Sequence, residues 1–374
     1  MRVFNVPSST PFLHTVIEAL VDGRLVDGFS ARIAPERLAD VTLYLPTRRA
    51  GRLAREVFLD VLDTDAVVLP RIVALGNVDE DELEFSDAAQ FGGAAAQFLP
   101  PKLDDLERRL TLARLVSAWA KRQPDSLVVG GPASTLALAG DLARLMDDMV
   151  TRGVGWDALN DIVPDELDIY WQHTLTFLKI ARETWPDYLT TIGRIEPAAR
   201  RDLLIAAEIS LLSSNPKGPV IAAGSTGSMP TTARLLHAIA TLPQGAVVLP
   251  GLDTDLDDDA WNSIGDVENP DDPSMPPPTW SHPQFALHHL LSRVFRIARR
   301  DVIALAPSHG REVLTSEAMR PASVSGAWHT ELEKPEIIAK IATGMTNLAV
   351  VETANPEMEA LAIAVAMREA RENG

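Results

Sequence analysis

The sequence predicts an α/β protein with a parallel sheet that is interrupted by an all-helical unit. Short apolar strands alternate with helices in the first 75 residues and again after residue 218. Between these stretches, residues 103 to 212 show helical spacing and no strand pattern. Alternating strands and helices are typical of a parallel sheet, so a helical block between two such stretches indicates one sheet domain with a large insertion.

Composition narrows the class of protein. A chain of 374 residues is long enough for two or three structural units, and its 46% apolar content supports a real core. The absence of Cys excludes disulfides and thiolate metal sites. No apolar run reaches 18 residues, and the N-terminus lacks a signal-peptide pattern, so we expect a cytoplasmic protein without a membrane span.

The net charge of −18 opposes nucleic-acid binding, because such surfaces are usually basic. Half of the excess lies in residues 253 to 272, which carry nine acidic residues and no Lys or Arg. A calcium loop needs spaced oxygen ligands, a Gly at its turn and a bidentate Glu, and this run has none of that spacing. We therefore expect a solvent-exposed acidic loop that binds no metal.

The chain opens with a strand, Val3 to Val6, followed by a helix with Phe12, Val16 and Leu20 at helical spacing. A nucleotide-binding protein places its phosphate loop at such a junction, using Gly-rich backbone, a Lys and a Ser or Thr. This loop has neither Gly nor Lys. Its residues are Pro7, Ser8, Ser9 and Thr10. The sequence thus predicts the scaffold of a phosphate loop without its chemistry.

A second strand is predicted at residues 41 to 46, followed by a helix that begins near Thr47. A third strand follows at residues 66 to 75. The helix is expected to bury one stripe of apolar residues, which are Leu53, Val57 and Val61.

The start of that helix is a candidate nucleic-acid contact. Thr47 follows a strand directly, and four arginines come after it, Arg48, Arg49, Arg52 and Arg55. A hydroxyl, the N–H groups of a helix start and guanidinium groups suit a phosphate of single-stranded nucleic acid. The alternative is a solvated helix face on which Arg52 pairs with Glu56 four residues later.

The helical block carries two apolar stripes. One is formed by Leu138, Leu142, Leu145 and Met149, and the other by Leu167, Trp171, Leu175 and Leu178. We expect four or five helices. The aromatic residues Tyr170, Trp171 and Phe177 are interpreted as core, with stacking on a base as the alternative.

The α/β pattern resumes with a strand at residues 219 to 224 and a helix at residues 231 to 242, then a strand from Gly245. Ser228 is the expected N-cap, and Pro230 lies near the first helical position. The loop before this helix could hold an anion, although it lacks the Lys of a phosphate loop; the alternative is a tight turn. Its residues are Gly224, Ser225, Thr226 and Gly227.

Residues 273 to 280 are Pro-rich, and residues 310 to 345 are poorly patterned. The last unit is predicted as a strand from Leu348 to Glu352, followed by a helix with an apolar face. One strand and one helix cannot bury both faces of a sheet, so we expect a second α/β domain to follow. No serine, cysteine, histidine or carboxylate constellation typical of catalysis or metal binding is found, so no catalytic residue is predicted.

Several segments together resemble one family. They are YLPTRRAGRLAREVF, LPRIVALGNVDEDEL, WQHTLTFLKI, AAGSTGSMPTTARLLHAIATLPQGAVVLPGLD, HPQFALHHLL and VVETANPEMEALAIAVAMREA. They are similar to the N-terminal part of the AddB family in its alphaproteobacterial form. AddB is one subunit of the AddAB helicase–nuclease, which processes double-strand DNA ends for recombinational repair.

The resemblance implies a fold like that of superfamily-one helicases, which is a P-loop NTPase-like architecture. A degenerate RecA-like domain would cover residues 1–100 and 215–305, with a helical insertion domain at residues 101–214. Residues 306–346 would form a linker, and residues 347–374 would start a second RecA-like domain.

The resemblance also implies a function. By position, VIAAGST replaces the helicase strand whose acids hold magnesium, which together with the missing Lys predicts a chain without ATPase activity. Thr47, Arg48 and Arg49 stand where active helicases have their first single-strand DNA motif, and Arg71 in LPRIVALGNVDEDEL is a further candidate. The chain would be a non-motor subunit that scaffolds an AddA-like partner and guides and scans the 3′ single strand from a double-strand end.

No cofactor is expected in this chain, since the iron–sulfur cluster and the nuclease Mg²⁺ of full-length AddB proteins would lie outside it. The alternative function is an ATP-binding enzyme with an atypical phosphate loop.

Overall fold

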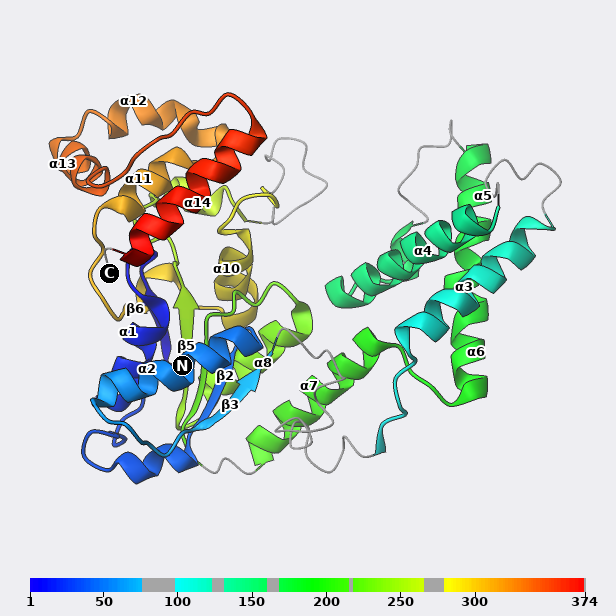
Figure 1. The fold of residues 1–374 in the computed structure, drawn as a ribbon, viewed down its shortest axis with the longest axis horizontal. Helices are drawn as coiled ribbons and strands as arrows, with labels where there is room; N and C mark the ends of the chain where they lie inside the picture. Colours follow the sequence, from blue (N-terminus) through cyan, green and yellow to red (C-terminus); the bar gives the residue numbers. More distant parts are fainter. Residues whose placement is uncertain (76–97, 123–130, 160–167, 215–217, 266–278, 373–374) are drawn as a thin grey trace.

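The computed structural model describes residues 1–75, 98–122, 131–159, 168–214, 218–265 and 279–372. Figure 1 shows a sheet with its helices at one side of the molecule and a separate group of helices at the other side. The predicted features at residues 76–97, Leu167 and residues 273–278 lie outside the described residues.

The α/β part is built on one six-stranded sheet in which all the paired strands are parallel, so the predicted α/β class is confirmed. The strand order is β3-β2-β4-β5-β1-β6. The strands are β1 (Val3–Val6), β2 (Thr42–Leu45), β3 (Arg71–Ala74), β4 (Val220–Ala223), β5 (Gly245–Pro250) and β6 (Ile303–Ala304). Strands from both sides of the helical segment therefore share one sheet.

Helices cover both faces of the sheet. Side chains alternate between the faces along each strand. In β1, Phe4 and Val6 pack with α1 (Phe12–Val21) and α2 (Arg48–Leu62), whereas Val3 joins the core on the opposite face. That second core contains residues of α7 (Pro197–Ser214) and α8 (Pro230–Thr241).

The helical unit has its own core, around the fully buried Leu112 and Trp185. Its helices are α3 (Asp105–Ala120), α4 (Pro132–Arg152), α5 (Asp168–Lys179) and α6 (Trp185–Ile192). Arg108, whose side chain is 8% exposed, forms ion pairs with Asp147 at 2.8 Å and with Glu196 at 2.6 Å. Helix α7 leaves this unit and returns the chain to the sheet (Figure 1).

The described part of the chain after β5 contains more helices than its sequence pattern predicts. Its helices are α9 (Asp258–Asn262), α10 (Phe285–His289), α11 (Arg311–Ala318), α12 (Trp328–Glu331), α13 (Pro335–Gly344) and α14 (Pro356–Glu372). Residues 310–345 thus form helices, although their sequence is poorly patterned.

Four local predictions are wrong. In the stripe predicted for α2, Val61 is buried and Val57 packs against the core, but Leu53 is 49% exposed, because the buried face runs through Gly51, Ala54 and Phe58. The N-cap of α8 is Met229 rather than Ser228, although Pro230 does occupy the first turn. The third strand is shorter than predicted, because it begins only after Pro70, which has no N–H to donate to a neighbouring strand.

The segment Leu348 to Glu352 is the fourth wrong prediction. It forms no strand and its residues are exposed. Its apolar β-branched residues favour an extended chain, but a strand needs a neighbour for its backbone hydrogen bonds. Among the described residues, the sheet ends at β6 and no other strand lies beside this segment.

Candidate functional site

The candidate site lies at the carboxyl edge of the sheet. Parallel strands end at one common edge, and open α/β sheets bind their ligands in the crevice outside it. The loops that follow β1, β2, β4 and β5 meet there. The structure therefore brings together the phosphate-loop position, the start of α2 and the loop that begins at Gly224.

The start of α2 has the predicted geometry. Thr47 is the N-cap, and its hydroxyl oxygen accepts a hydrogen bond from the Ala50 N–H at 3.1 Å. This leaves the Thr47 hydroxyl hydrogen able to donate outward. Thr47, Arg49 and Arg52 are exposed, whereas Arg48 is half-buried and has an intramolecular partner.

The outer face of α2 is basic. Arg49, Arg52 and Arg55 are exposed along it, beside the exposed Leu53. No ion pair joins Arg52 to Glu56, both of which are described residues, so the pairing expected for a solvated helix face is not formed. The face combines guanidinium groups with apolar surface.

The loop after β4 is packed tightly against the same edge. Gly224 has φ +83°, and a Cβ at this position would lie 3.1 Å from Phe12 and 3.2 Å from Pro46. The Ser225 hydroxyl oxygen accepts a hydrogen bond from the Gly227 N–H at 3.3 Å, while Ser225 and Thr226 are half-buried. The loop thus has the tight-turn geometry of the alternative interpretation.

The loop after β1 contacts a carboxylate from a distant part of the chain. The Ser9 N–H donates to Glu312 Oε1 at 2.9 Å, and the Ser9 hydroxyl donates to the same oxygen. The His309 N–H donates to Glu312 Oε2 at 3.0 Å. Partial burial raises the pKa of the Glu312 carboxyl, but these hydrogen bonds outweigh it and the pKa lies below its ordinary value.

The loop after β5 carries the first part of the acidic segment, and there the prediction of an exposed acidic loop is wrong. Leu256, Ala260, Trp261 and Ile264 are buried in the core. Their burial anchors the short helix α9, and three carboxylates around it, those of Asp255, Asp257 and Asp258, have basic partners. The rest of the segment, residues 266–272, lies outside the described residues.

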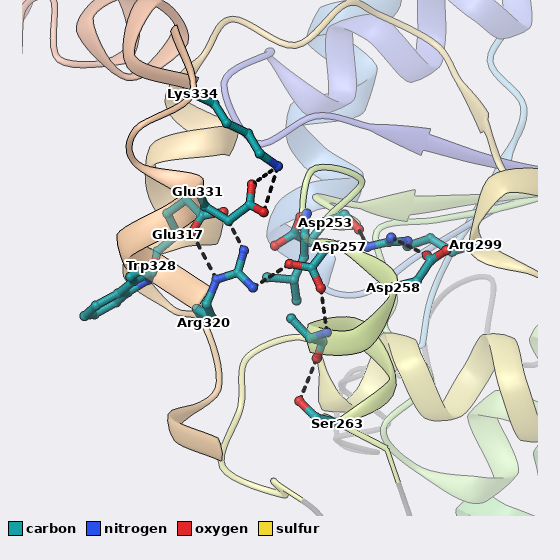
Figure 2. A network of polar contacts seen from close by, with 12 residues as sticks. Asp253, Asp257, Asp258, Ser263, Arg299, Glu317, Arg320, Trp328, Glu331 and Lys334 are labelled. Carbon is teal, nitrogen blue, oxygen red and sulfur yellow. Dashed lines mark hydrogen bonds and ion pairs between the residues drawn. The ribbon is translucent and has the colours of Figure 1, made fainter. Parts of the chain in front are cut away.

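Two arginines, Arg299 and Arg320, pair with these carboxylates (Figure 2). Arg320 binds Asp257, and Arg299 lies 3.1 Å from Asp258 while its guanidinium stacks 4.8 Å from the Trp261 ring. Partial burial raises the pKa of Asp257, but hydrogen bonds from the Ala260 N–H and from Arg320 outweigh it, and the pKa is lowered. The described part of the acidic segment, residues 253–265, is therefore less negative than its sequence indicates.

Asp255 is partnered by Lys340 of α13 at 3.7 Å. Burial raises the pKa of the Asp255 carboxyl despite this lysine. Arg320 also pairs with Glu317 at 2.8 Å, and the Trp328 indole N–H donates to the Glu317 carbonyl oxygen at 2.7 Å. Figure 2 shows Arg320 between Glu317 and Asp257, where α9 faces the helices that follow β6.

Arg71 lies apart from the other candidates. It is the first residue of β3 and pairs with Thr42, the first residue of β2, so it lies at the amino edge of the sheet. Its guanidinium is 3.5 Å from Glu208, which is fully buried on α7 and also accepts a hydrogen bond from the Tyr44 hydroxyl. Burial and the neighbouring Glu208 raise the pKa of Tyr44. Through these contacts, Glu208 links α7 to strands β2 and β3.

Sequence reasoning missed Glu312 and Arg320 as site residues. Each is an ordinary charged residue in or near a short helix, and the partner that joins it to the edge of the sheet, Ser9 or Asp257, lies far away in the chain. The one local signal for the order of the acidic segment was the helical spacing of Leu256, Ala260 and Ile264 among the acids.

In the described part of the chain, no group of three or more His, Cys, Asp or Glu side chains is placed to hold a metal ion. No described helix is both long enough and apolar enough to cross a bilayer.

The fold defines the class of this protein, an α/β protein with helices on both faces of a parallel sheet. No protein-family model matches the chain. A search of curated proteins gives no significant match.

Proposed function

We propose that this chain is a non-motor, helicase-like subunit that holds single-stranded DNA at the carboxyl edge of its sheet during double-strand break repair. The observation that carries the proposal is the start of α2. A capping hydroxyl and the exposed guanidinium groups of Arg49 and Arg52 are presented together at the edge where this class of fold binds ligands.

The electrostatic objection to DNA binding is weakened by where the acids lie. Two strand spacings of roughly 4.8 Å separate β2 from β5, the strand that the acidic segment follows, so the loops after β2 and β5 begin about 10 Å apart. At about 0.15 M salt the Debye length is roughly 8 Å, so the acids of that segment are partly screened from Arg49. The nearest part of the acidic segment is also partnered by Arg299, Arg320 and Lys340.

The absence of ATPase chemistry is the second part of the proposal. The loop after β1 has no Lys for the β- and γ-phosphates, and the loop after β4 has no carboxylate for a metal. With β1 between β5 and β6, and β4 beside β5, the strand order is compatible with a degenerate RecA-like domain. The resemblance to AddB adds the expected partner, an AddA-like motor subunit.

The test measures binding of a fluorescent oligothymidine by anisotropy over a series of salt concentrations. Each lost phosphate contact lowers the slope of log affinity against log salt by about 0.7, so Arg49→Ala with Arg52→Ala should flatten it by about 1.4. Arg48 is left intact because it has an intramolecular partner.

The matched control is Arg300→Ala. Arg300 is also exposed, but it lies just before β6, which is four strand positions away from β2 in the sheet. The proposal is overturned if the Arg49 and Arg52 variant keeps the affinity and slope of the wild type, or if Arg300→Ala flattens the slope as much. Saturable binding of a labelled ATP analogue by the wild type would instead favour the alternative, an ATP-binding enzyme.

A further inference from the structure

The phosphate-loop position is occupied by a side chain of the protein itself. Glu312 lies in the first turn of α11, 303 residues after Ser9 in the sequence. Both of its carboxylate oxygens accept hydrogen bonds, one from two groups of Ser9 and the other from the His309 N–H. Three donors converging on one carboxylate form a small anion site.

The helix that follows this loop provides a second, independent reason for an anion here. The N-cap of α1 is Pro11, which makes no capping hydrogen bond, and the first turn of α1 has no acidic residue. The positive end of the helix dipole is therefore not balanced by the helix's own sequence, and a negative group near it is stabilising. Glu312 brings that charge from elsewhere in the chain.

The loop is also held firmly in position. The Gly251 N–H donates to the Val6 carbonyl oxygen at 2.9 Å, and a Cβ on Gly251 would lie 2.5 Å from Ser8 Oγ. The buried Asn5 side chain exchanges two hydrogen bonds with the Leu252 backbone, at 2.8 and 3.2 Å. These hydrogen bonds hold the backbone just before Ser9 against the loop after β5, so the position of the Ser9 donors is constrained.

We propose that the loop after β1 has kept the ability to bind an oxyanion, and that its resident ligand is the Glu312 carboxylate in place of a phosphate. The contact makes residues 306–346 a strap over the carboxyl edge of the sheet. Two further contacts hold the same strap, Lys340 on Asp255 at 3.7 Å and Arg320 on Asp257.

Glu312 is held beside Ser9 by the folded chain. A group tethered in this way reaches an effective concentration in the millimolar range or above, so a free oxyanion must displace a strong competitor. Inorganic phosphate should therefore bind the wild type poorly. Removing the carboxylate should strengthen its binding by at least about tenfold, which corresponds to about 1.4 kcal/mol.

The experiment compares binding of labelled inorganic phosphate by equilibrium dialysis at constant ionic strength. The full chain is used as wild type, Glu312→Ala, Glu312→Gln, and Glu312→Ala combined with Ser9→Ala. The control is Glu336→Ala. Glu336 is the second residue of α13, as Glu312 is of α11, and each is the acidic residue in the first turn of its helix. Hydrogen exchange of the peptide that contains Ser9 provides a readout that needs no added ligand.

We expect one saturable phosphate site in Glu312→Ala, a smaller gain in Glu312→Gln, and loss of the gain when Ser9→Ala is added. Exchange at Ser9 should be faster in both Glu312 variants than in the wild type, and phosphate should slow it again. If Glu312→Ala does not fold, phosphate binding and Ser9 exchange are compared between Glu312→Gln and the wild type.

The proposal is overturned if phosphate binds the Glu312 variants no better than it binds the wild type and Glu336→Ala, or if Ser9 exchange is unchanged. None of these measurements involves DNA, so their outcome is separate from that of the proposed function.

Discussion

Replacing Arg320 by Ala should be one of the most destabilising charge substitutions in this chain. The Arg320 side chain is 1% exposed and its partner Glu317 is 8% exposed, so the substitution leaves a carboxylate in the interior without its cation. Breaking a buried pair in this way costs about 3 to 5 kcal/mol. Asp257, the other partner, is 41% exposed, and its loss adds only up to about 1 kcal/mol.

Urea unfolding followed by far-UV circular dichroism measures this change as a lower midpoint at constant slope. The matched control is Arg368→Ala in α14, where both the arginine and its partner Glu372 are more than half exposed. That pair is four residues apart on a helix surface, and its loss should cost only about 0.3 to 0.5 kcal/mol.

A double variant tests the physical reason directly. Glu317→Gln combined with Arg320→Met removes both charges from the interior, so it should be less destabilised than Arg320→Ala alone. The reasoning fails if Arg320→Ala costs less than about 1 kcal/mol, or if the double variant is the less stable of the two.

Two further predictions concern a left-handed glycine and the loop after β1. Gly23→Ala should lower the thermal midpoint more than Gly28→Ala; both glycines have a left-handed φ that costs an L-residue about 1 to 2 kcal/mol, but only a Gly23 Cβ collides with backbone, at the Phe29 carbonyl oxygen, whereas Gly28 faces open space. Equal midpoints in the two variants would contradict this. The lowered pKa of Glu312 means that its ionised form stabilises the fold above its ordinary value of 4.5 and that this contribution is lost as the pH falls through the folded-state pKa. The difference in unfolding free energy between wild type and Glu312→Gln should therefore shrink below about pH 4.5, and a constant difference from neutral to acid pH would refute the assignment.

The central strands were predictable because each is a short apolar run bounded by turn residues. Strands β1, β2, β4 and β5 are buried on both faces, which removes the polar alternation and leaves a clear apolar signal. The sixth strand was missed because it has only two residues, and Ile303 is 57% exposed. A strand this short is defined by its neighbour rather than by its own composition.

The contacts of the candidate site were predictable only in part. The Thr47 cap is local, and a Thr between a strand and a helical pattern is enough to predict it. The contact between Ser9 and Glu312 joins residues at opposite ends of the chain, and no local pattern records it. The acidic segment was misjudged because a dense run of charge indicates a loop, whereas the arginines that neutralise it are distant in sequence.

The unequal ends of the sheet have a consequence for how the protein behaves at high concentration. An open sheet exposes unpaired backbone groups at its outer strands, and these can recruit a strand from another molecule. Here one outer strand, β6, offers two residues, and the other, β3, begins after Pro70 with a charged Arg71. Short, charged or proline-bounded edges of this kind disfavour strand addition, so intermolecular β-sheet growth should begin from partly unfolded chains rather than from the native sheet.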